Sequence, residues 1–310
     1  MNERRRSLTV NCLAGLLLTL ILFGGGGCSS SPTVQDRSNI DEEFERTSRA
    51  ARMAFDTGKF QQAVGLYQQA LERAYIFDNS QAIVNTQYNL AVCLAGLQSY
   101  DKALEKVRQA ESELADVDQS IPADILLLEA TLLYHLDRQE EARRLTDQVL
   151  TESNPISAAV QSKAHFLRGL MAARRGDTQQ LRQEIVALGK PATAGLRADR
   201  EELVGRLSMA EGNWNEAVEA FDRTAEFRQD NFDYSEMVNA LALAARACEQ
   251  AGKLSEASKR YLRAGRSAAR QERNRDALNW LNRAEKLAGE AGDESTARQA
   301  RSYRQWLESP

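Results

Sequence analysis

The sequence predicts an all-α protein, and three observations support this prediction. The chain of 310 residues contains 45 alanines and only five prolines, so residues that favour helices dominate it. Aromatic residues make up only 6% and runs of β-branched residues are few, which disfavours a sheet protein. Charged residues make up 27% and hydrophobic residues 43%, a balance that excludes wholesale disorder and allows a sizeable core.

The strongest pattern is an internal repeat of small residues. One small residue recurs at intervals of 36 to 40 residues, as Ala51, Ala91, Ala130, Gly169, Gly205 and Ala245. Twelve positions later a second position is small in five of six copies, as Ala63, Ala103, Ala142, Leu181, Ala217 and Ala257. Small residues on facing sides let two antiparallel helices approach closely, so each copy predicts one helical hairpin.

The turn inside each hairpin has its own signature. Glycine ends the first helix in four copies, as Gly58, Gly176, Gly212 and Gly252. Two positions beyond the turn stands a bulky residue that we expect to fill the gap between successive hairpins, as Phe60, Tyr100, Trp214 and Leu254. Proline falls between hairpins, where its missing amide hydrogen does no harm, as Pro122, Pro155 and Pro191.

Together these spacings resemble the tetratricopeptide repeat over roughly residues 42–308. The resemblance implies a right-handed solenoid of about six hairpins, with the repeats in residues 41–254. Residues 255–310 would hold the last helices, at about 255–272, 275–289 and 293–308, and the final helix would cap the solenoid. The spacing exceeds the ~34 residues of a standard repeat, so we expect longer helices or loops. The copy that contains Leu181 departs most from the pattern.

The N-terminus predicts export. Three arginines, Arg4 to Arg6, precede an apolar run over residues 8–23, four glycines and then Cys28. This order resembles a bacterial lipoprotein signal, although Gly25 stands where that family prefers leucine. The resemblance implies that residues 1–27 are removed, that the Cys28 thiol receives diacylglycerol and that its new amino group is acylated. Ser29 after the cysteine implies sorting to the outer membrane in enterobacterial-type envelopes.

The alternative for this segment is an uncleaved transmembrane anchor. Residues 8–27 have about the ~20 residues that a membrane span requires. Four successive glycines disfavour a helix there. Two or more acyl chains would instead hold the mature protein stably on a membrane. Residues 28–40 have the composition of a flexible tether with a typical reach of about 20 Å.

Charge and cysteine content narrow the possible partners. Residues 28–310 carry 37 basic and 43 acidic residues, a net charge of −6, which argues against nucleic acid as the main partner.

Cys93 and Cys248 lie 155 residues apart, each in a helical pattern. Neither their number nor their spacing resembles a disulfide framework, so we expect both to be buried.

Few residues in the sequence suggest catalysis. Only two histidines exist, His135 and His165, without the spacing of a metal site or a catalytic pair, so ordinary helix-face positions are expected. No GxxxxGK[ST] motif is present. The sequence therefore predicts no enzyme, no cofactor, no metal and no small-molecule substrate.

A tetratricopeptide solenoid generally binds a peptide or helix along the concave surface formed by its first helices. The resemblance places this groove at Arg52, Asn85, Tyr88, Asp124, Thr131, Tyr134, Lys163, Phe166, Arg174, Arg206 and Arg246. The arginines would bind an acidic segment and the aromatic residues apolar side chains. The alternative is a solvated inner face without a ligand. The Lys/Asn carboxylate clamp of chaperone-binding members is not recognisable.

A second candidate surface is basic. Residues 255–310 carry 12 basic and 8 acidic residues, and a helical spacing of i, i+3, i+7 and i+10 predicts one helix face with Arg263, Arg266, Arg270 and Arg273. This stripe could bind an anionic lipid, glycan polymer or acidic protein. The alternative is a solvated face paired with carboxylates of the next helix.

The function that these features favour is a membrane-anchored scaffold or adaptor in a bacterial cell-envelope machine. Its partners would be envelope proteins or peptide segments, and its pathway outer-membrane assembly, pilus or secretin biogenesis, or recruitment of peptidoglycan enzymes. The competing hypothesis is direct binding of an anionic envelope polymer or lipid through the arginine stripe.

Overall fold

The computed structural model describes residues 41–151 and 156–309, and all fourteen elements in these ranges are α-helices. The predicted signal peptide, Cys28, the tether and Pro155 lie outside the described residues. The described residues divide into two compact units, with the boundary between Ala164 and His165. None of the described helices is long and apolar enough to cross a membrane.

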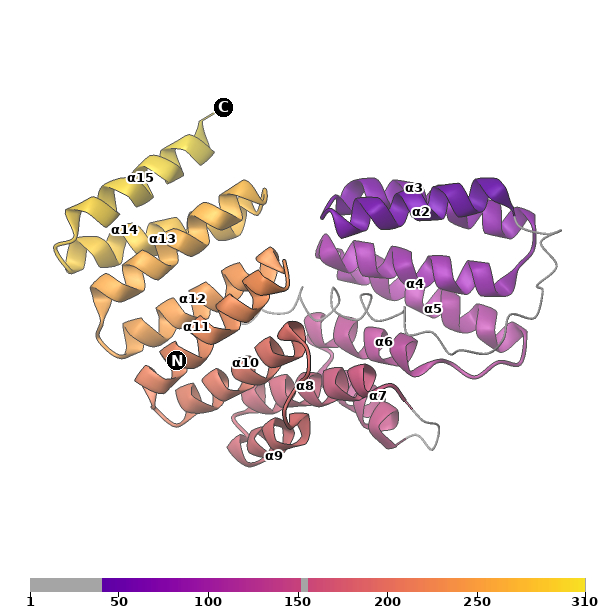
Figure 1. Ribbon diagram of the computed structural model, residues 1–310, viewed down its shortest axis with the longest axis horizontal. Coiled ribbons are helices and arrows are strands. Elements are labelled where there is room, and N and C mark those ends of the chain that lie inside the picture. The colour runs from indigo at the N-terminus through magenta and orange to yellow at the C-terminus, as the bar shows by residue number, and fades with distance from the viewer. Residues whose placement is uncertain (1–40, 152–155, 310) are drawn as a thin grey trace. The chain divides into compact units, whose positions relative to one another are not determined.

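The first unit consists of three hairpins and the beginning of a fourth. Its helices follow one another as stacked antiparallel pairs (Figure 1). They are α2 (Glu42–Asp56), α3 (Phe60–Ile76), α4 (Ser80–Gly96), α5 (Tyr100–Asp116), α6 (Ala123–His135), α7 (Gln139–Thr151) and the start of α8 (Ala158–Arg175). The apolar centre of this unit is richest in α6, where ten of thirteen residues are buried.

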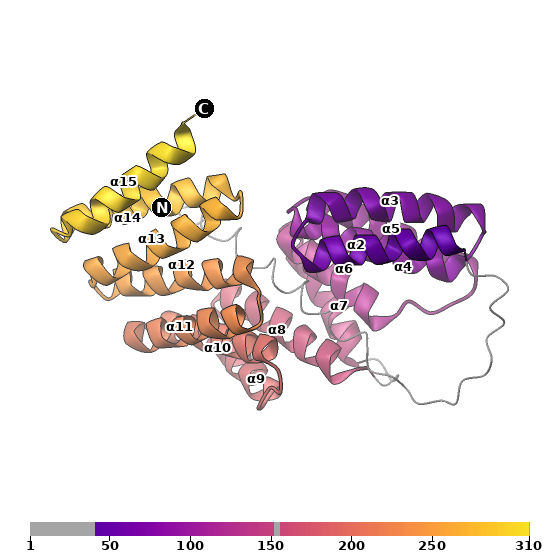
Figure 2. The ribbon, with the colours of Figure 1, turned by 45° about the horizontal axis from the view of Figure 1, so that its top comes forward.

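The second unit continues the same arrangement from within α8. Its helices are α9 (Thr178–Leu188), α10 (Ala194–Ala210), α11 (Trp214–Asp230), α12 (Tyr234–Gln250), α13 (Leu254–Arg270), α14 (Asn274–Glu290) and α15 (Glu294–Glu308). Figure 2 shows α10 to α15 as successive layers of this unit. Helix α15 packs on α13 and α14 and buries Ala297 and Ala300, as expected of a capping helix. The predicted all-α solenoid of about six hairpins with a C-terminal cap is confirmed.

The small residues bring the helices together as predicted. All six residues of the second small position, from Ala63 to Ala257, have no exposed surface. Gly205 of α10 approaches α11 so closely that a Cβ atom there would lie 2.7 Å from the ring of Phe221. Leu181 is the exception in size, and its helix α9 is the shortest at 11 residues.

The turns within the hairpins have the glycine and the bulky residue that the sequence predicted. Gly58 has φ +74°, a conformation that favours glycine, and the amide of Lys59 donates to Ala54 O at 2.8 Å to close the end of α2. Two of the bulky residues that follow the turns contact the next hairpin. Tyr100 stacks on His135 of α6 with 4.2 Å between ring centroids, and Phe60 lies against Gly96 of α4. Cys93 and Cys248, the two cysteines among the described residues, are buried and free.

Candidate functional site

The first helices of the hairpins share one polar position. It lies six residues before the small residue of each repeat. In the first unit it is occupied by Glu45, Asn85, Asp124 and Lys163, and in the second by Asp199 and Asn239. Because stacked hairpins of equal register place equivalent residues side by side, each unit carries a row of polar groups on its first helices. Asn85, Asp124 and Lys163 were predicted to line the groove; Asp199 and Asn239 belong to the same row but were missed.

In the first unit the structure brings two predicted groove residues together. Tyr88 of α4 and Asp124 of α6 lie close enough to interact electrostatically: burial raises the pKa of Tyr88, and the Asp124 carboxylate raises it further. Burial also raises the pKa of Asp124, although its carboxylate accepts the Ile125 amide at 3.1 Å. Asn85 is exposed and accepts a bond from Gln81 at 2.9 Å.

Four predicted groove residues are not exposed. Thr131, Tyr134, Lys163 and Phe166 are all buried, so the prediction that they lie on an open surface is wrong. The Thr131 hydroxyl donates to Leu127 O in its own helix, where it is satisfied without a ligand. Tyr134 and Phe166 carry large apolar rings whose removal from water is favourable.

Most of the predicted arginines already have interactions within the chain. Arg206 binds Glu202 of the same helix with bonds of 2.6 and 3.0 Å, and Arg174 is half-buried. Arg246 is half-buried beside Tyr261, whose pKa is raised to about 12 mainly by burial. Arg52 is exposed. An acidic ligand on this face would therefore compete with the Glu202 carboxylate for Arg206.

A buried ionic network in the second unit was missed by the sequence analysis. Arg228 of α11 is 1% exposed and donates to Asp199 at 2.6 Å and to Asp233 at 3.4 Å. Burial lowers the pKa of Arg228, but Asp199 and Asp233 more than offset this and raise it. Burial and the Asp233 carboxylate raise the pKa of Glu236 to about 7.

A signal for this network exists in the sequence. Arg228 is the fifteenth residue of a 17-residue helix, and the same place in the other second helices of that length is held by Ala74, Leu114 and Ala268. All three are buried and apolar. A charged residue at a core position requires buried partners, so the register itself marks Arg228.

The predicted arginine stripe is shorter than its spacing suggests. Helix α13 ends at Arg270, so Arg273 lies beyond it and does not share its face. Arg273 instead donates to Asn239 at 2.8 Å, to Asp276 at 2.8 Å and to the Ser235 carbonyl at 2.9 Å. Arg263, Arg266 and Arg270 are exposed on α13, and no carboxylate of the described residues forms an ion pair with them.

The two histidines have different surroundings. His135 stacks on Tyr100, whereas His165 places Nδ1 2.8 Å from the buried Glu184 carboxylate, which also accepts a bond from Arg168 at 2.7 Å. These bonds join α8 to α9 within one hairpin. Burial raises the pKa of Glu184, but the hydrogen bonds from His165 and Arg168 outweigh it and lower the pKa overall. Among the residues described, no group of three His, Cys, Asp or Glu side chains is arranged to hold a metal ion.

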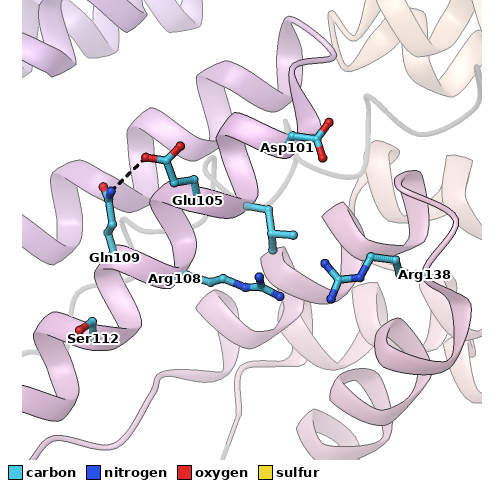
Figure 3. Close-up of a pocket in the computed structure, with 7 residues that line it drawn as sticks. Asp101, Glu105, Arg108, Gln109, Ser112 and Arg138 are labelled. Atoms are coloured by element: carbon cyan, nitrogen blue, oxygen red, sulfur yellow. Dashed lines mark hydrogen bonds between the residues drawn. The ribbon is translucent and has the colours of Figure 1, made fainter.

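A hollow of about 440 Å³ is lined by a second helix and a turn rather than by the first helices that carry the polar row. It lies between α5 and the turn that leads into α7. Figure 3 shows the guanidinium groups of Arg108 and Arg138 pointing toward one another across it. Glu105 and Gln109 on α5 are bonded to each other at 3.1 Å. The sequence analysis did not find this hollow, because its residues come from second helices and a turn.

Comparison with known proteins identifies the repeat. Residues 44–112 match the tetratricopeptide repeat family. This match covers α3, α4 and nearly all of α2 and α5, and solved structures extend the likeness over most of the chain. No protein with a curated description matches the sequence.

The structural likeness concerns the fold. The quorum sensor NprR bound to its cognate peptide NprX has a TM-score of 0.63 at 12% identity, over 88% of this chain and 80% of NprR. The apo form of NprR from B. thuringiensis gives 0.56 at 13% identity, over 87% of this chain and 88% of NprR. A Rap protein bound to the competence and sporulation factor has a TM-score of 0.52 at 13% identity, over 86% of this chain and 98% of the Rap protein. The chain therefore has a tetratricopeptide-like solenoid fold.

Proposed function

We propose that the protein is a tetratricopeptide scaffold that binds segments of partner proteins on the first helices of its hairpins. The part of the polar row on the first helices of the first unit carries this proposal, because Asn85 is exposed there and Glu45 and Asp124 are partly exposed. The other members of the row, Lys163, Asp199 and Asn239, are buried and contribute no open surface. Polar groups repeated at one interval along a solenoid suit the repeating backbone of an extended peptide or the face of a helix. The complex of NprR with its cognate peptide NprX supports it by analogy of fold.

We further propose that Cys28 is lipidated and anchors this scaffold in a bacterial envelope, on the outer membrane. Anchoring would restrict the search for partners to the membrane surface and raise their effective concentration. The scaffold would serve an assembly machine for outer-membrane proteins, pili or secretins, or recruit peptidoglycan enzymes. The signal-like order of Arg4 to Cys28 supports this part of the proposal.

Site-specific photo-crosslinking tests the binding face. A photoreactive amino acid at Asn85, an exposed member of the polar row on α4, should capture a defined partner in the native membrane. The same amino acid at Gln69, an exposed amide side chain on α3, is the matched control. Equal capture from both positions would show that the first helices are not the binding face.

The same experiment in a Cys28→Ala variant tests the anchor. Loss of the variant from the membrane fraction, together with loss of the Asn85 crosslink, is the expected result. A variant that stays on the membrane would contradict lipidation at Cys28 without bearing on the binding face.

The second candidate function is direct binding of an anionic envelope polymer or lipid through α13. The observation that favours it is an aromatic ring beside the basic residues: the Arg270 guanidinium lies 5.0 Å from the ring centroid of Trp306, whose surface is 50% exposed. Binding through Arg263 and Arg266 should weaken steeply with salt. Unchanged polymer binding after Arg266→Glu and Arg270→Glu would exclude it.

A further inference from the structure

The hollow between α5 and the α6–α7 turn has the features of a second binding site, separate from the face considered above. Arg108 lies on α5, and Arg138 directly precedes α7, so two neighbouring hairpins each contribute one guanidinium group to it (Figure 3). Each guanidinium already pairs with one carboxylate of the chain, Arg108 with Glu129 and Arg138 with Glu141, so a further anion would use the donors that these pairs leave unbonded. We propose that this hollow binds a carboxylate-bearing segment of a partner protein.

Both arginines retain hydrogen-bond donors for such a ligand. Arg108 uses only Nε, which donates to Glu129 at 3.3 Å, and its two terminal nitrogens have no partner among the described residues. Arg138 donates from Nε and Nη2 to Glu141 at 2.7 and 2.6 Å, which leaves Nη1. Three N–H-bearing nitrogens therefore remain, and guanidinium nitrogens of this kind form strong, oriented bonds with a carboxylate.

The arginines at this end of the hollow already act on the carboxylates of the chain. The hydrogen bond from Arg138 lowers the pKa of Glu141, and the charges of Arg144 and Arg108 lower it further. Three arginines thus act on one carboxylate. A ligand carboxylate between Arg108 and Arg138 would meet these positive charges together with the negative charges of Glu129 and Glu141, so its binding would depend on the unbonded N–H groups.

The rest of the lining limits the kind of anion. Asp101 and Glu105 contribute carboxylates to the same hollow, while Gln109, Ser112 and Leu104 contribute uncharged groups. A polymer with closely spaced phosphates would bring its neighbouring charges against Asp101 and Glu105. An acidic side chain of a peptide presents one carboxylate, and the amides beside it can donate to the two acidic residues. A protein segment therefore fits the lining better than a polyanion.

The test is a titration of the full-length protein in detergent with an acetylated Glu-Gly repeat peptide. The Gln-Gly counterpart of this peptide and inorganic phosphate are titrated separately as further probes. Binding of each probe is measured from the NMR signals of the arginine Nε–H groups. Arg108→Gln should weaken binding of the glutamate peptide by about tenfold, because a charge-assisted pair is lost. The matched control is Arg143→Gln on α7, which removes an arginine paired with Glu140 and Asp147 outside the hollow and should change binding less than about twofold.

Glu141→Gln separates binding from a merely structural role of these residues. The substitution releases Arg138 from its carboxylate partner, so it should strengthen binding of the glutamate peptide, whereas loss of a structural ion pair would weaken it or leave it unchanged. Three other results would overturn the proposal: equal binding of the Gln-Gly peptide, equally tight binding of phosphate, or an equal loss in Arg143→Gln.

Discussion

Leu114 in the first unit and Arg228 in the second occupy the same place in their helices, but they are stabilised by different physics. Leu114 is buried and needs only apolar neighbours. Arg228 is equally buried and needs two carboxylates at defined positions, which Asp199 and Asp233 supply. The comparison shows that the repeat fixes where a side chain lies, while its neighbours decide which chemistry is tolerated there.

The largest expected effect comes from Arg228→Ala. This change leaves Asp199 and Asp233 buried without their cation, and breaking a buried pair in this way costs about 3–5 kcal/mol. Leu114→Ala at the matching place should cost about 2–5 kcal/mol. Urea unfolding as a function of pH separates the two mechanisms. The loss in Arg228→Ala should become smaller as the pH falls, whereas the Leu114→Ala loss should not depend on pH.

The next effect concerns close helix approach. Gly205→Ala would bring a Cβ atom within 2.7 Å of the buried Phe221 ring, and overpacking of this kind costs about 1–3 kcal/mol. Gly65→Ala on α3 meets no atom within 4 Å and should instead stabilise its helix by about 0.5–1 kcal/mol. Thermal unfolding of both variants checks the opposite signs. Destabilisation by Gly65→Ala would contradict the packing argument.

A smaller effect concerns titration of buried carboxyl groups. Burial and Asp233 raise the pKa of Glu236 to about 7, so the folded chain binds this proton more tightly than the unfolded chain. Stability should therefore fall as pH rises toward 7 and level off above it, by at most about 1.4 kcal/mol per pH unit. Glu236→Gln should flatten this dependence in urea titrations.

Glu111 offers the matching comparison in the first unit. Burial and the Glu129 carboxylate raise its pKa to about 7 as well, but Glu111 is only half-buried. Glu111→Gln should therefore flatten the pH dependence less than Glu236→Gln does. A larger effect of Glu111→Gln would reverse the ranking that burial predicts.

The sequence predicted the hairpins because their determinants are local. Gly58 ends a helix and Ala63 permits close packing regardless of distant residues, so period and composition suffice. The sites depend on which residues become neighbours across hairpins. Arg138 and Arg108 lie 30 positions apart, and Arg228 and Asp199 lie 29 apart, so no spacing rule brings them together.

The groove prediction failed in part for the same reason. The register correctly placed Asn85 and Asp124 on the first helices, and the same register would have found Asp199. Exposure does not follow from register, because the size of neighbouring side chains decides it. Phe166 and Thr131 are therefore buried at positions that the family pattern assigns to an open surface.

The smallest predicted effect compares two turns of the second unit. Phe232 has φ +59° and is 77% exposed, so a bulky residue adopts a left-handed conformation without burial to offset it. Gly252 has φ +74° at another turn, where no atom lies within 4 Å of an added Cβ. Phe232→Gly should raise stability by about 0.5–1 kcal/mol, and Gly252→Ala should lower it by about 1 kcal/mol. Differential scanning calorimetry measures both. Destabilisation by Phe232→Gly would mean that contacts of the phenyl ring, such as its edge contact with Tyr234 at 6.4 Å, outweigh the backbone strain.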